Sequence, residues 1–394
     1  MLAFARIKTV LAAMRCHETW TLPPRVSRTL FRALFATRPS SAPSGTLLYV
    51  NGPAIGTRSF GRYVSALKRL KRCAGLPLVA HLSVTDRCVN RCDRCSNLSA
   101  SPSDPSLASL LPVIARLREA GTVSLAFTGG EPLLRDDLPQ LVAACGKPMT
   151  TFLFTTGFGL DTCRARELRR AGLTAAFVSL DHYRAEEHDR IRGSKGAFDQ
   201  AVGAIRACIE AGIYTAAQSV VEPAMLVKAE MDRFLGFCRS LGVHEVNLLE
   251  PMPVRSACHA PSLDEGDRDM LRRLHVRAAR DSSLPKVTTM PFLEGPEFLG
   301  CQAGFTFLYV SAGGEVYPCD FAPISFGNIH ETDFGEILSR LRRHFAAPSC
   351  KCLALRLPEI GGESLELPCP WERTETLMKH YDPGEPPALM KAIL

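Results

Sequence analysis

Between residues 78 and 250 the chain alternates short apolar, β-branched runs with longer stretches of helical periodicity, and this alternation constrains the fold more than any other feature. The strand candidates are residues 78–85, 122–128, 150–156, 175–181, 214–221 and 244–250. Strands separated by helix-length crossovers predict parallel βα units joined by right-handed connections. We therefore expect an α/β fold built on a partial (β/α)6 TIM-like barrel.

Two of the intervening stretches carry the apolar stripe of an amphipathic helix. The stripe consists of Leu107, Leu110, Leu111, Ile114 and Leu117 in the first stretch, and of Phe198, Val202, Ile205 and Ile209 in the second. This period predicts helices that pack against the sheet. Pro112 lies inside the first helix and lacks a backbone donor, so we expect it to disturb the start or the straightness of that helix.

Changes in composition on either side of the barrel divide the chain into four segments. They are a basic, mainly helical N-terminal extension (1–77), the barrel core (78–255), a connecting helical segment (256–300) and a small cysteine-rich C-terminal domain (301–394). The last of these is expected to fold as a separate unit beside the barrel.

The first 39 residues form a basic amphipathic pattern. They contain seven Arg and Lys residues and one acid, Glu18, with apolar residues interspersed. Such a pattern suits contact with an anionic membrane surface, or equally a helix that packs on the main domain and keeps its arginines solvated. Residues 38–46, rich in Pro, Ser and Gly, are typical of a linker or loop.

Composition limits the compartment and the partners. The formal net charge of +7 in 394 residues comes without a long basic block interleaved with aromatic residues, so a nucleic-acid partner is not indicated. Fifteen cysteines are an odd number in a chain too large to need disulfide bonds, which favours a reducing compartment. No apolar stretch is long enough to span a membrane, and the first residues lack a signal-peptide pattern. We therefore expect a cytoplasmic protein.

Polar motifs follow four successive strand candidates. They are RCVNRCDRC (87–95), GGEPLLR (129–135), TTG (155–157) and SLDHY (179–183). Because the carboxyl ends of parallel strands meet at one rim, we expect these motifs to lie together. The thiolates of Cys88, Cys92 and Cys95 can converge on one metal centre, and sulfur ligands favour zinc or an iron–sulfur cluster. Three ligands leave one coordination position open for a substrate.

CVNRCDRC after a first strand, followed by GGEPLL after a second, resembles the radical S-adenosylmethionine (radical SAM) superfamily over residues 78–250. The resemblance implies a [4Fe–4S] cluster on the three cysteines, with S-adenosylmethionine (SAM) bound to its open iron. It also implies that an electron from the cluster cleaves SAM to methionine and a 5′-deoxyadenosyl radical, which abstracts hydrogen from a substrate carbon. A flavodoxin- or ferredoxin-type protein is then the expected electron donor.

The same resemblance assigns SAM contacts to the other motifs. The expected cofactor-binding set is Gly129, Gly130, Glu131, Pro132, Ser179, Asp181, Arg192 and Gln218. By resemblance, Glu131 and its neighbours hold the methionine ammonium group, Arg192 meets the cofactor carboxylate, and Ser179 and Asp181 suit the ribose. Each assignment has an alternative. Gly129 and Gly130 could form an ordinary Gly-Gly turn, and Ser179 and Asp181 could cap the next helix. Arg192 could be solvated at the surface, and Gln218 could be a hydrogen-bonded amide of the core.

Arg94 departs from the pattern of the family, which usually has an aromatic residue near the adenine just before the third cysteine. Adenine could stack on the guanidinium plane instead, or Arg94 could point outward. The sequence assigns no residue a catalytic role.

A second set of cysteines lies near the C-terminus. Its members are Cys301, Cys319, Cys350, Cys352 and Cys369, with a hairpin expected around Gly313 and Gly314. The stretch GGEVYPC resembles the G-x4-C element of the auxiliary-cluster domains called SPASM or twitch. The resemblance implies one auxiliary [4Fe–4S] cluster, held by Cys301, Cys319 and two of the other three cysteines, with Cys352 favoured over Cys350; a zinc site is the alternative. The cysteines outside both sets lack ligand spacing and are expected to be packing residues.

Together these features predict a radical SAM enzyme that performs a net oxidation or a bond-forming modification in a biosynthetic pathway. Two alternatives for the substrate stay open: maturation of a ribosomally made peptide, and modification of a lipid or small metabolite at a membrane surface. Residues 1–77 show little strand pattern, which gives a dedicated peptide-binding module poor support. A non-catalytic iron–sulfur carrier or regulator is the least favoured interpretation.

Overall fold

The computed structural model describes residues 2–70, 76–92, 94–97, 104–253, 262–362, 365–391 and 394. In this part of the chain a nine-stranded sheet has the order β11-β10-β3-β4-β5-β6-β7-β8-β9. Its strands are β3 (Val79–Ser83), β4 (Ser124–Thr128), β5 (Thr150–Thr155), β6 (Ala175–Ser179), β7 (Tyr214–Val220), β8 (Glu245–Leu249), β9 (Val287–Thr289), β10 (Phe307–Val310) and β11 (Val316–Tyr317). The six expected strands correspond to β3–β8, and the prediction of a parallel α/β barrel is confirmed.

The sheet extends beyond the six expected strands at both edges. The short strand β9 pairs parallel with β8, and β10 pairs parallel with β3. The strands β10 and β11 form the expected antiparallel hairpin, with Gly314 in its turn at a positive φ of 91°. The C-terminal segment is thus hydrogen-bonded into the barrel sheet as well as lying beside it.

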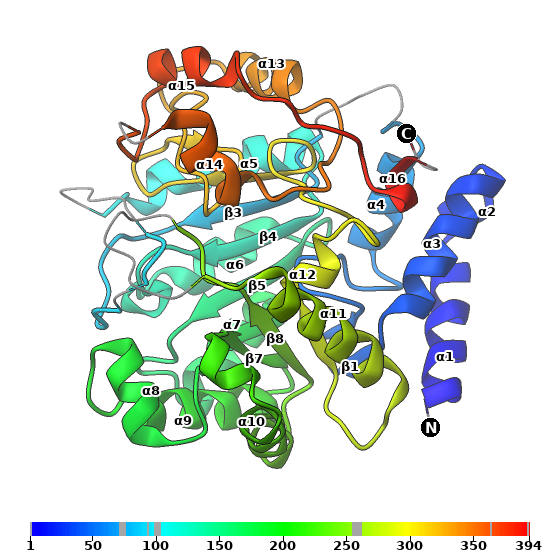
Figure 1. Cartoon of the computed structure of the whole chain (residues 1–394), viewed down its shortest axis with the longest axis vertical. Helices are drawn as coiled ribbons and strands as arrows, with labels where there is room; N and C mark the ends of the chain where they lie inside the picture. Colours follow the sequence, from blue (N-terminus) through cyan, green and yellow to red (C-terminus); the bar gives the residue numbers. More distant parts are fainter. Residues whose placement is uncertain are drawn as a thin grey trace.

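The crossover helices cover the outer face of the sheet (Figure 1). They are α5 (Leu107–Ala120), α6 (Leu138–Cys145), α7 (Thr162–Ala171), α8 (Ala185–Arg192), α9 (Ala197–Glu210) and α10 (Lys228–Ser240). Helix α5 begins after Ser106, whose hydroxyl accepts from the Ser109 N–H, and it accommodates Pro112 in its interior. The expected stripe of α5 is correct except at Leu111, which is exposed, whereas Val113 is buried in its place.

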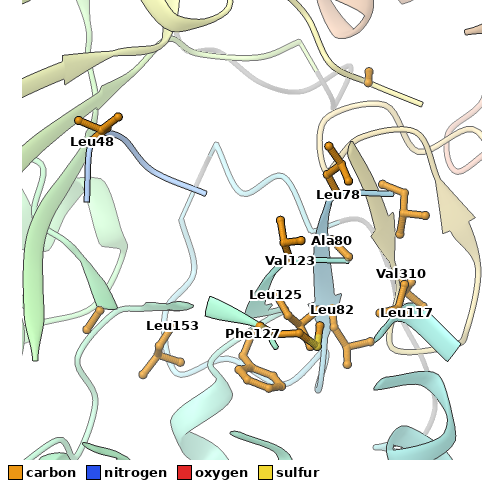
Figure 2. Close-up of a cluster of buried hydrophobic side chains, with 14 of the residues drawn as sticks. Leu48, Leu78, Ala80, Leu82, Leu117, Val123, Leu125, Phe127, Leu153 and Val310 are labelled. Atoms are coloured by element: carbon orange, nitrogen blue, oxygen red, sulfur yellow. The ribbon is translucent and has the colours of Figure 1, made fainter. Parts of the chain in front are cut away.

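The main hydrophobic core lies between the sheet and these helices. Alternate residues of β3 and β4 point toward the helices, and Figure 2 shows Leu82 and Leu125 near Leu117 of α5 and Val310 of β10. These side chains are almost fully buried. Their burial removes apolar surface from water. It stabilises the packing of α5 on the face of the sheet that β3, β4 and β10 form.

The inward-facing side chains change character along the barrel. Near the amino ends of the strands they are apolar, and Phe152, Phe177 and Tyr214 form a floor with residues of an N-terminal hairpin. That hairpin pairs β1 (Ser40–Ala42) with β2 (Gly45–Leu47), so much of the stretch expected as a linker is a paired hairpin. The floor closes one end of the barrel and leaves polar inward positions at the other.

The N-terminal helices lie along one side of the barrel (Figure 1). They are α1 (Leu2–Met14), α2 (His17–Trp20), α3 (Pro24–Ala36) and α4 (Arg58–Leu67). Arg6 donates to the carbonyl of Ala279, and Arg38 donates to carbonyls at the end of α11 (Glu265–Arg280). Cations at a helix C-terminus satisfy carbonyls that have no partner within the helix. The N-terminal segment therefore packs on the main domain, as one of the two alternatives expected, but Arg6 and Arg38 are hydrogen-bonded to carbonyls instead of being solvated.

The remaining helices follow the barrel. They are α12 (Met290–Leu293), α13 (Phe334–His344), α14 (Leu353–Gly361), α15 (Trp371–Met378) and α16 (Ala388–Lys391), and two short 3-10 helices are η1 (Pro132–Leu134) and η2 (Pro223–Leu226). Figure 1 shows α13, α14 and α15 gathered beyond the β3 side of the sheet. Within the described residues, no helix is both long and apolar enough to cross a membrane.

Candidate active site

Cysteines from both expected sets line one cavity at the carboxyl ends of the barrel strands. The cavity has a volume of about 370 Å³. Its lining includes five cysteines: Cys88, Cys92, Cys95, Cys301 and Cys319. The first three lie on residues 85–95, which we call the cysteine loop, and the other two lie in the C-terminal segment. The two candidate metal centres therefore face the same space.

Close backbone contacts hold the cysteine loop on two sides. The Gly130 N–H donates to the Thr85 carbonyl at 2.7 Å, and a Cβ at Gly130 would lie 2.0 Å from the carbonyl oxygen of Arg87. Only glycine permits such an approach, which explains the second glycine of the GGE motif. On the other side, the Arg91 N–H donates to the Arg192 carbonyl at 3.1 Å. The loop is thus positioned by β4 and by the end of α8.

The thiols of the cysteine loop lie close enough to influence one another. Burial raises the pKa of the Cys88 thiol, and the nearby Glu131, Cys92 and Cys95 raise it further. Neighbouring thiolates need a cation between them, because their charges repel in a partly buried site. This donor set fits the cluster that the sequence resemblance implies.

Glu131 is fully buried, and its carboxylate is already satisfied. It accepts from the hydroxyls of Thr155 and Thr156 at 2.6 Å each and from the N–H groups of Thr156 and Leu133 at 2.6 and 3.0 Å. These bonds fasten the GGE motif to the TTG motif at the end of β5. The structure therefore favours a positioning role for Glu131. Neither Glu131 nor Pro132 lines the cavity, whereas Gly129 and Gly130 do.

Asp181 and Arg192 form a buried ion pair at the end of β6. Their side chains are 2.6 Å apart and only 1% and 15% exposed, respectively. Burial alone would raise the pKa of the Asp181 carboxyl, but the Arg192 and Arg94 guanidinium groups lower it below its usual value. Arg192 also lies 3.9 Å from the Cys92 sulfur. The alternative of a solvated Arg192 is therefore wrong, and the pair stands between the cysteine loop and the barrel strands.

Polar side chains form a row at one level inside the barrel. Ser179 of β6 is in register with Gln218 of β7, which is in register with Asn247 of β8 and then Thr288 of β9. The Asn247 amide donates to Gln218 at 2.9 Å, and Thr288 donates to Asn247 at 3.0 Å. Ser179, Gln218 and Asn247 line the cavity. They offer hydrogen-bond donors and acceptors directly above the apolar floor.

Arg94 turns inward, so the alternative of an outward-pointing side chain is wrong. Its guanidinium group pairs with Glu222 after β7 at 2.9 Å, and its side chain is 9% exposed. Arg94 also lines the cavity. A stacked adenine would thus meet a guanidinium plane that Glu222 already holds in place.

Only some of the five cysteines expected near the auxiliary cluster lie together in the described structure, and a carboxylate lies with them. Glu294, Cys301 and Cys352 place one ligand atom each within 4.8 Å of one another. Contact with Cys352 lowers the pKa of the Cys301 thiol to about 7, against the opposite effect of burial. Cys319 lines the same cavity as Glu294 and Cys301. Sequence reasoning missed Glu294.

Cys350 and Cys369 do not join this group. Cys369 is buried in the core, its N–H donates to the Pro323 carbonyl, and its thiol donates to the Pro370 carbonyl. Neither Cys350 nor Cys369 lines the cavity. Their expected role as ligands stays a prediction.

Three of the five described cysteines outside both sets are core residues, as expected. Cys145, Cys208 and Cys238 are fully buried, and burial raises their thiol pKa far above the usual value. Cys163 is exposed on α7, and Cys73 and Cys258 lie outside the described residues. The packing role is thus supported for the buried three.

His81 is a cavity residue that sequence reasoning did not single out. It occupies an inward position on β3, and its Nδ1 lies 2.6 Å from an Asp320 carboxylate oxygen. Its Nε2 lies 3.0 Å from the side-chain oxygen of Asn51. The only signal in the sequence is a histidine within an otherwise apolar strand, because its two partners come from distant segments.

Comparison with protein families gives two matches. Residues 82–229 match the radical SAM superfamily, and residues 301–353 match the SPASM iron-sulfur cluster-binding domain. Both matches fall within the segments expected for them. The limits of the N-terminal and connecting segments stay predictions.

Comparison with individual proteins finds relatives of the same kind. The chain is 27% identical over 296 residues to the AdoMet-dependent heme synthase of Oleidesulfovibrio alaskensis, covering 67% of this chain and 76% of that protein. It is 26% identical over 247 residues to the enzyme of that name from Methanosarcina barkeri, covering 57% and 70%.

Among solved structures, Streptococcus suis SuiB bound to its precursor peptide SuiA superposes with a TM-score of 0.56 at 16% identity, covering 71% of this chain and 68% of that chain. SuiB bound to S-adenosylmethionine gives a TM-score of 0.57 at 14% identity, covering 76% and 71%. At this identity the likeness concerns the fold alone.

Proposed function

The chain belongs to the radical SAM superfamily and carries a C-terminal SPASM domain, and from this premise we propose that it abstracts hydrogen from a C–H bond of a small organic substrate and completes a net oxidation. When bound, the [4Fe–4S] cluster and SAM supply the electron and the radical that removes the hydrogen. Cys88, Cys92 and Cys95 would hold that cluster. An auxiliary cluster, held in part by Cys301 and Cys319, would accept the electron that a net oxidation releases.

The shared cavity is the observation that carries this proposal. It is lined by the cysteine loop on one side and by Cys301 and Cys319 on the other. A substrate in this space would lie near both metal centres. Its volume of about 370 Å³ falls within the range of about 300 to 1,000 Å³ that is usual for ligand pockets.

The residues of the cavity suit the binding of SAM and substrate. Ser179, Gln218 and Asn247 present polar groups in one row, which supports hydrogen bonding to the ribose or to the substrate. The Asp181–Arg192 ion pair contacts the cysteine loop, because Arg192 lies beside the Cys92 sulfur. Apolar residues of the floor exclude water from the end of the cavity, which protects a reactive intermediate.

A reconstitution experiment tests the proposal. The anaerobically reconstituted and reduced wild type is expected to cleave SAM to 5′-deoxyadenosine, whereas the triple variant Cys88→Ala, Cys92→Ala, Cys95→Ala is expected to be inactive and to retain about four irons in the auxiliary centre. A wild type that binds iron and sulfide but neither binds nor cleaves SAM would favour the carrier or regulator. A triple variant without iron would contradict the auxiliary cluster.

The relatives suggest which substrates to assay first. Two are named AdoMet-dependent heme synthase, so haem formation from tetrapyrrole precursors is the first specific reaction to test. A peptide substrate receives less support: the described residues 2–70 form helices and one short hairpin, and this differs from a peptide-binding module of several strands followed by helices. Haem formed by the wild type and not by the triple cysteine variant would establish the substrate.

Peripheral membrane contact is a second candidate property, carried by a different observation. Ile7, Leu11 and Trp20 are exposed apolar side chains at 56%, 51% and 67%, on a basic N-terminal segment. Such a surface favours anionic lipid. Wild type is expected to co-sediment with anionic liposomes, and the variant Ile7→Glu, Leu11→Glu, Trp20→Glu is not. Equal sedimentation of the two proteins would remove the membrane argument.

A further inference from the structure

Glu294 lies where a fourth ligand of the auxiliary centre is needed. It is the C-cap residue that directly follows α12, and its N–H donates to the Met290 carbonyl at 2.9 Å, which fixes the turn. Its carboxylate places an oxygen within 4.8 Å of the sulfurs of Cys301 and Cys352. The carboxylate also lines the shared cavity.

The surroundings of Glu294 contain acids and thiols. Glu250, Cys301 and Asp320 line the same cavity as Glu294. In the described part of the chain, the other two acids have cationic or ionisable partners: Glu250 pairs with Arg268 at 2.8 Å, and Asp320 pairs with His81 at 2.6 Å. No such partner or hydrogen-bond donor reaches the Glu294 carboxylate within the same described residues.

A carboxylate held among thiols without a donor is unfavourable unless a cation binds there. Removing an ionised carboxylate from water costs several kcal/mol, and proteins offset this cost by protonating the group or by pairing it with a cation or a metal. Its neighbours Cys301, Cys319 and Cys352 are soft ligands suited to iron. One oxygen and three sulfurs provide four ligands, which is the number that a closed cluster requires.

We propose that Glu294 is a ligand of the auxiliary iron–sulfur cluster, together with Cys301, Cys319 and Cys352. One iron is then bound by a carboxylate oxygen in place of a fourth thiolate. This inference rests on the auxiliary cluster of the proposed function, and is independent of the substrate. Glu294 would thus hold the cluster from a position that lines the cavity.

The test uses the triple variant Cys88→Ala, Cys92→Ala, Cys95→Ala of the full chain, in which the auxiliary centre is the remaining cluster. In this background we expect Glu294→Gln to lower the iron content from about four to about three per chain and to give the EPR signal of an oxidised three-iron cluster, because a neutral amide is a poor iron ligand. Glu294→Cys is expected to restore about four irons with a changed EPR spectrum and a lower midpoint potential.

Control variants separate ligand loss from general damage. Glu297→Gln removes a nearby exposed acid that pairs with Arg272, and is expected to leave iron content and EPR spectrum unchanged. Cys350→Ser, Cys369→Ser and Cys258→Ser are expected to retain about four irons in the same background. Far-UV circular dichroism checks that Glu294→Gln, which is nearly isosteric, keeps the fold.

Several outcomes would overturn the inference. An unchanged EPR spectrum and iron content in Glu294→Gln would show that Glu294 lines the cavity without binding the cluster. Loss of one iron in the Cys258, Cys350 or Cys369 variant instead would assign the fourth ligand to that cysteine. Zinc without iron in the triple cysteine variant would overturn the cluster itself. Failure of the wild type to cleave SAM, with the Glu294 effects intact, would contradict the proposed function and leave this ligand assignment standing.

Discussion

His81 and Asp320 join the barrel to the C-terminal segment through a hydrogen bond of 2.6 Å between Nδ1 and a carboxylate oxygen. His81 lies on β3, whereas Asp320 directly follows Cys319, and their side chains are 6% and 19% exposed. A bond between partly buried, ionisable groups is worth more than one at the surface. It therefore ties the wall of the cavity to the segment that carries the auxiliary cysteines.

A double-mutant cycle measures this connection. We expect His81→Ala and Asp320→Ala to show a coupling of about 1–3 kcal/mol in the free energy of unfolding under anaerobic conditions. The exposed pair Arg373–Glu366, at 3.0 Å, serves as a matched control and should couple by less than about 1 kcal/mol. Additive effects of the two substitutions in the first pair would show that the bond contributes nothing.

Gly130 is expected to tolerate no side chain. A Cβ there would lie 2.0 Å from the Arg87 carbonyl oxygen, so Gly130→Ala must displace the cysteine loop. The variant should lose the SAM-binding cluster, about four irons, and retain the auxiliary one. Gly203→Ala is the control, because nothing lies within 4 Å of the added carbon on α9, and it should stabilise the protein by up to about 1 kcal/mol. Full iron content in Gly130→Ala would contradict the steric argument.

The barrel was predictable because its signals are local. Each strand β3–β8 is an apolar run long enough to recognise, and polar residues such as Gln218 and Asn247 stand out within such runs. Strand β9 and the pairing of β10 with β3 were not predicted: the two strands are only three and four residues long, and each pairing joins segments distant in the sequence.

The missing parts of the site depend on tertiary contacts. Glu294 is one acid among many in the sequence and shows no spacing relation to Cys301 and Cys352, yet the turn after α12 brings it to them. Glu131 was expected to hold the SAM ammonium group, but spacing cannot reveal that Thr155 and Thr156 satisfy its carboxylate. A motif indicates which residues meet, whereas the folded contacts determine which of them is still free to bind.

Arg94 is expected to resist replacement by the aromatic residue usual in its family. Arg94→Tyr would leave the Glu222 carboxylate without its partner at 2.9 Å, at a cost of about 1–3 kcal/mol. The double variant Arg94→Tyr, Glu222→Gln removes both charges and should recover most of the stability. Anaerobic thermal unfolding and SAM affinity measure the two effects. A single variant as stable as wild type would show that the ion pair is dispensable.

His188 is expected to make stability depend on pH. Its Nδ1 accepts from the Asp181 N–H at 3.1 Å, and burial lowers the pKa of the imidazole from 6.5 to about 4 despite the nearby Asp181 carboxylate. Because the unfolded chain binds this proton more readily, the contribution of neutral His188 is complete above pH 6.5 and is lost as the pH falls toward 4, at roughly 1.4 kcal/mol per pH unit. His188→Asn keeps an acceptor and cannot titrate, so the difference in unfolding free energy between wild type and variant should shrink or reverse toward low pH. A difference that is constant from pH 7 to pH 4 would show that His188 is not held neutral by its site.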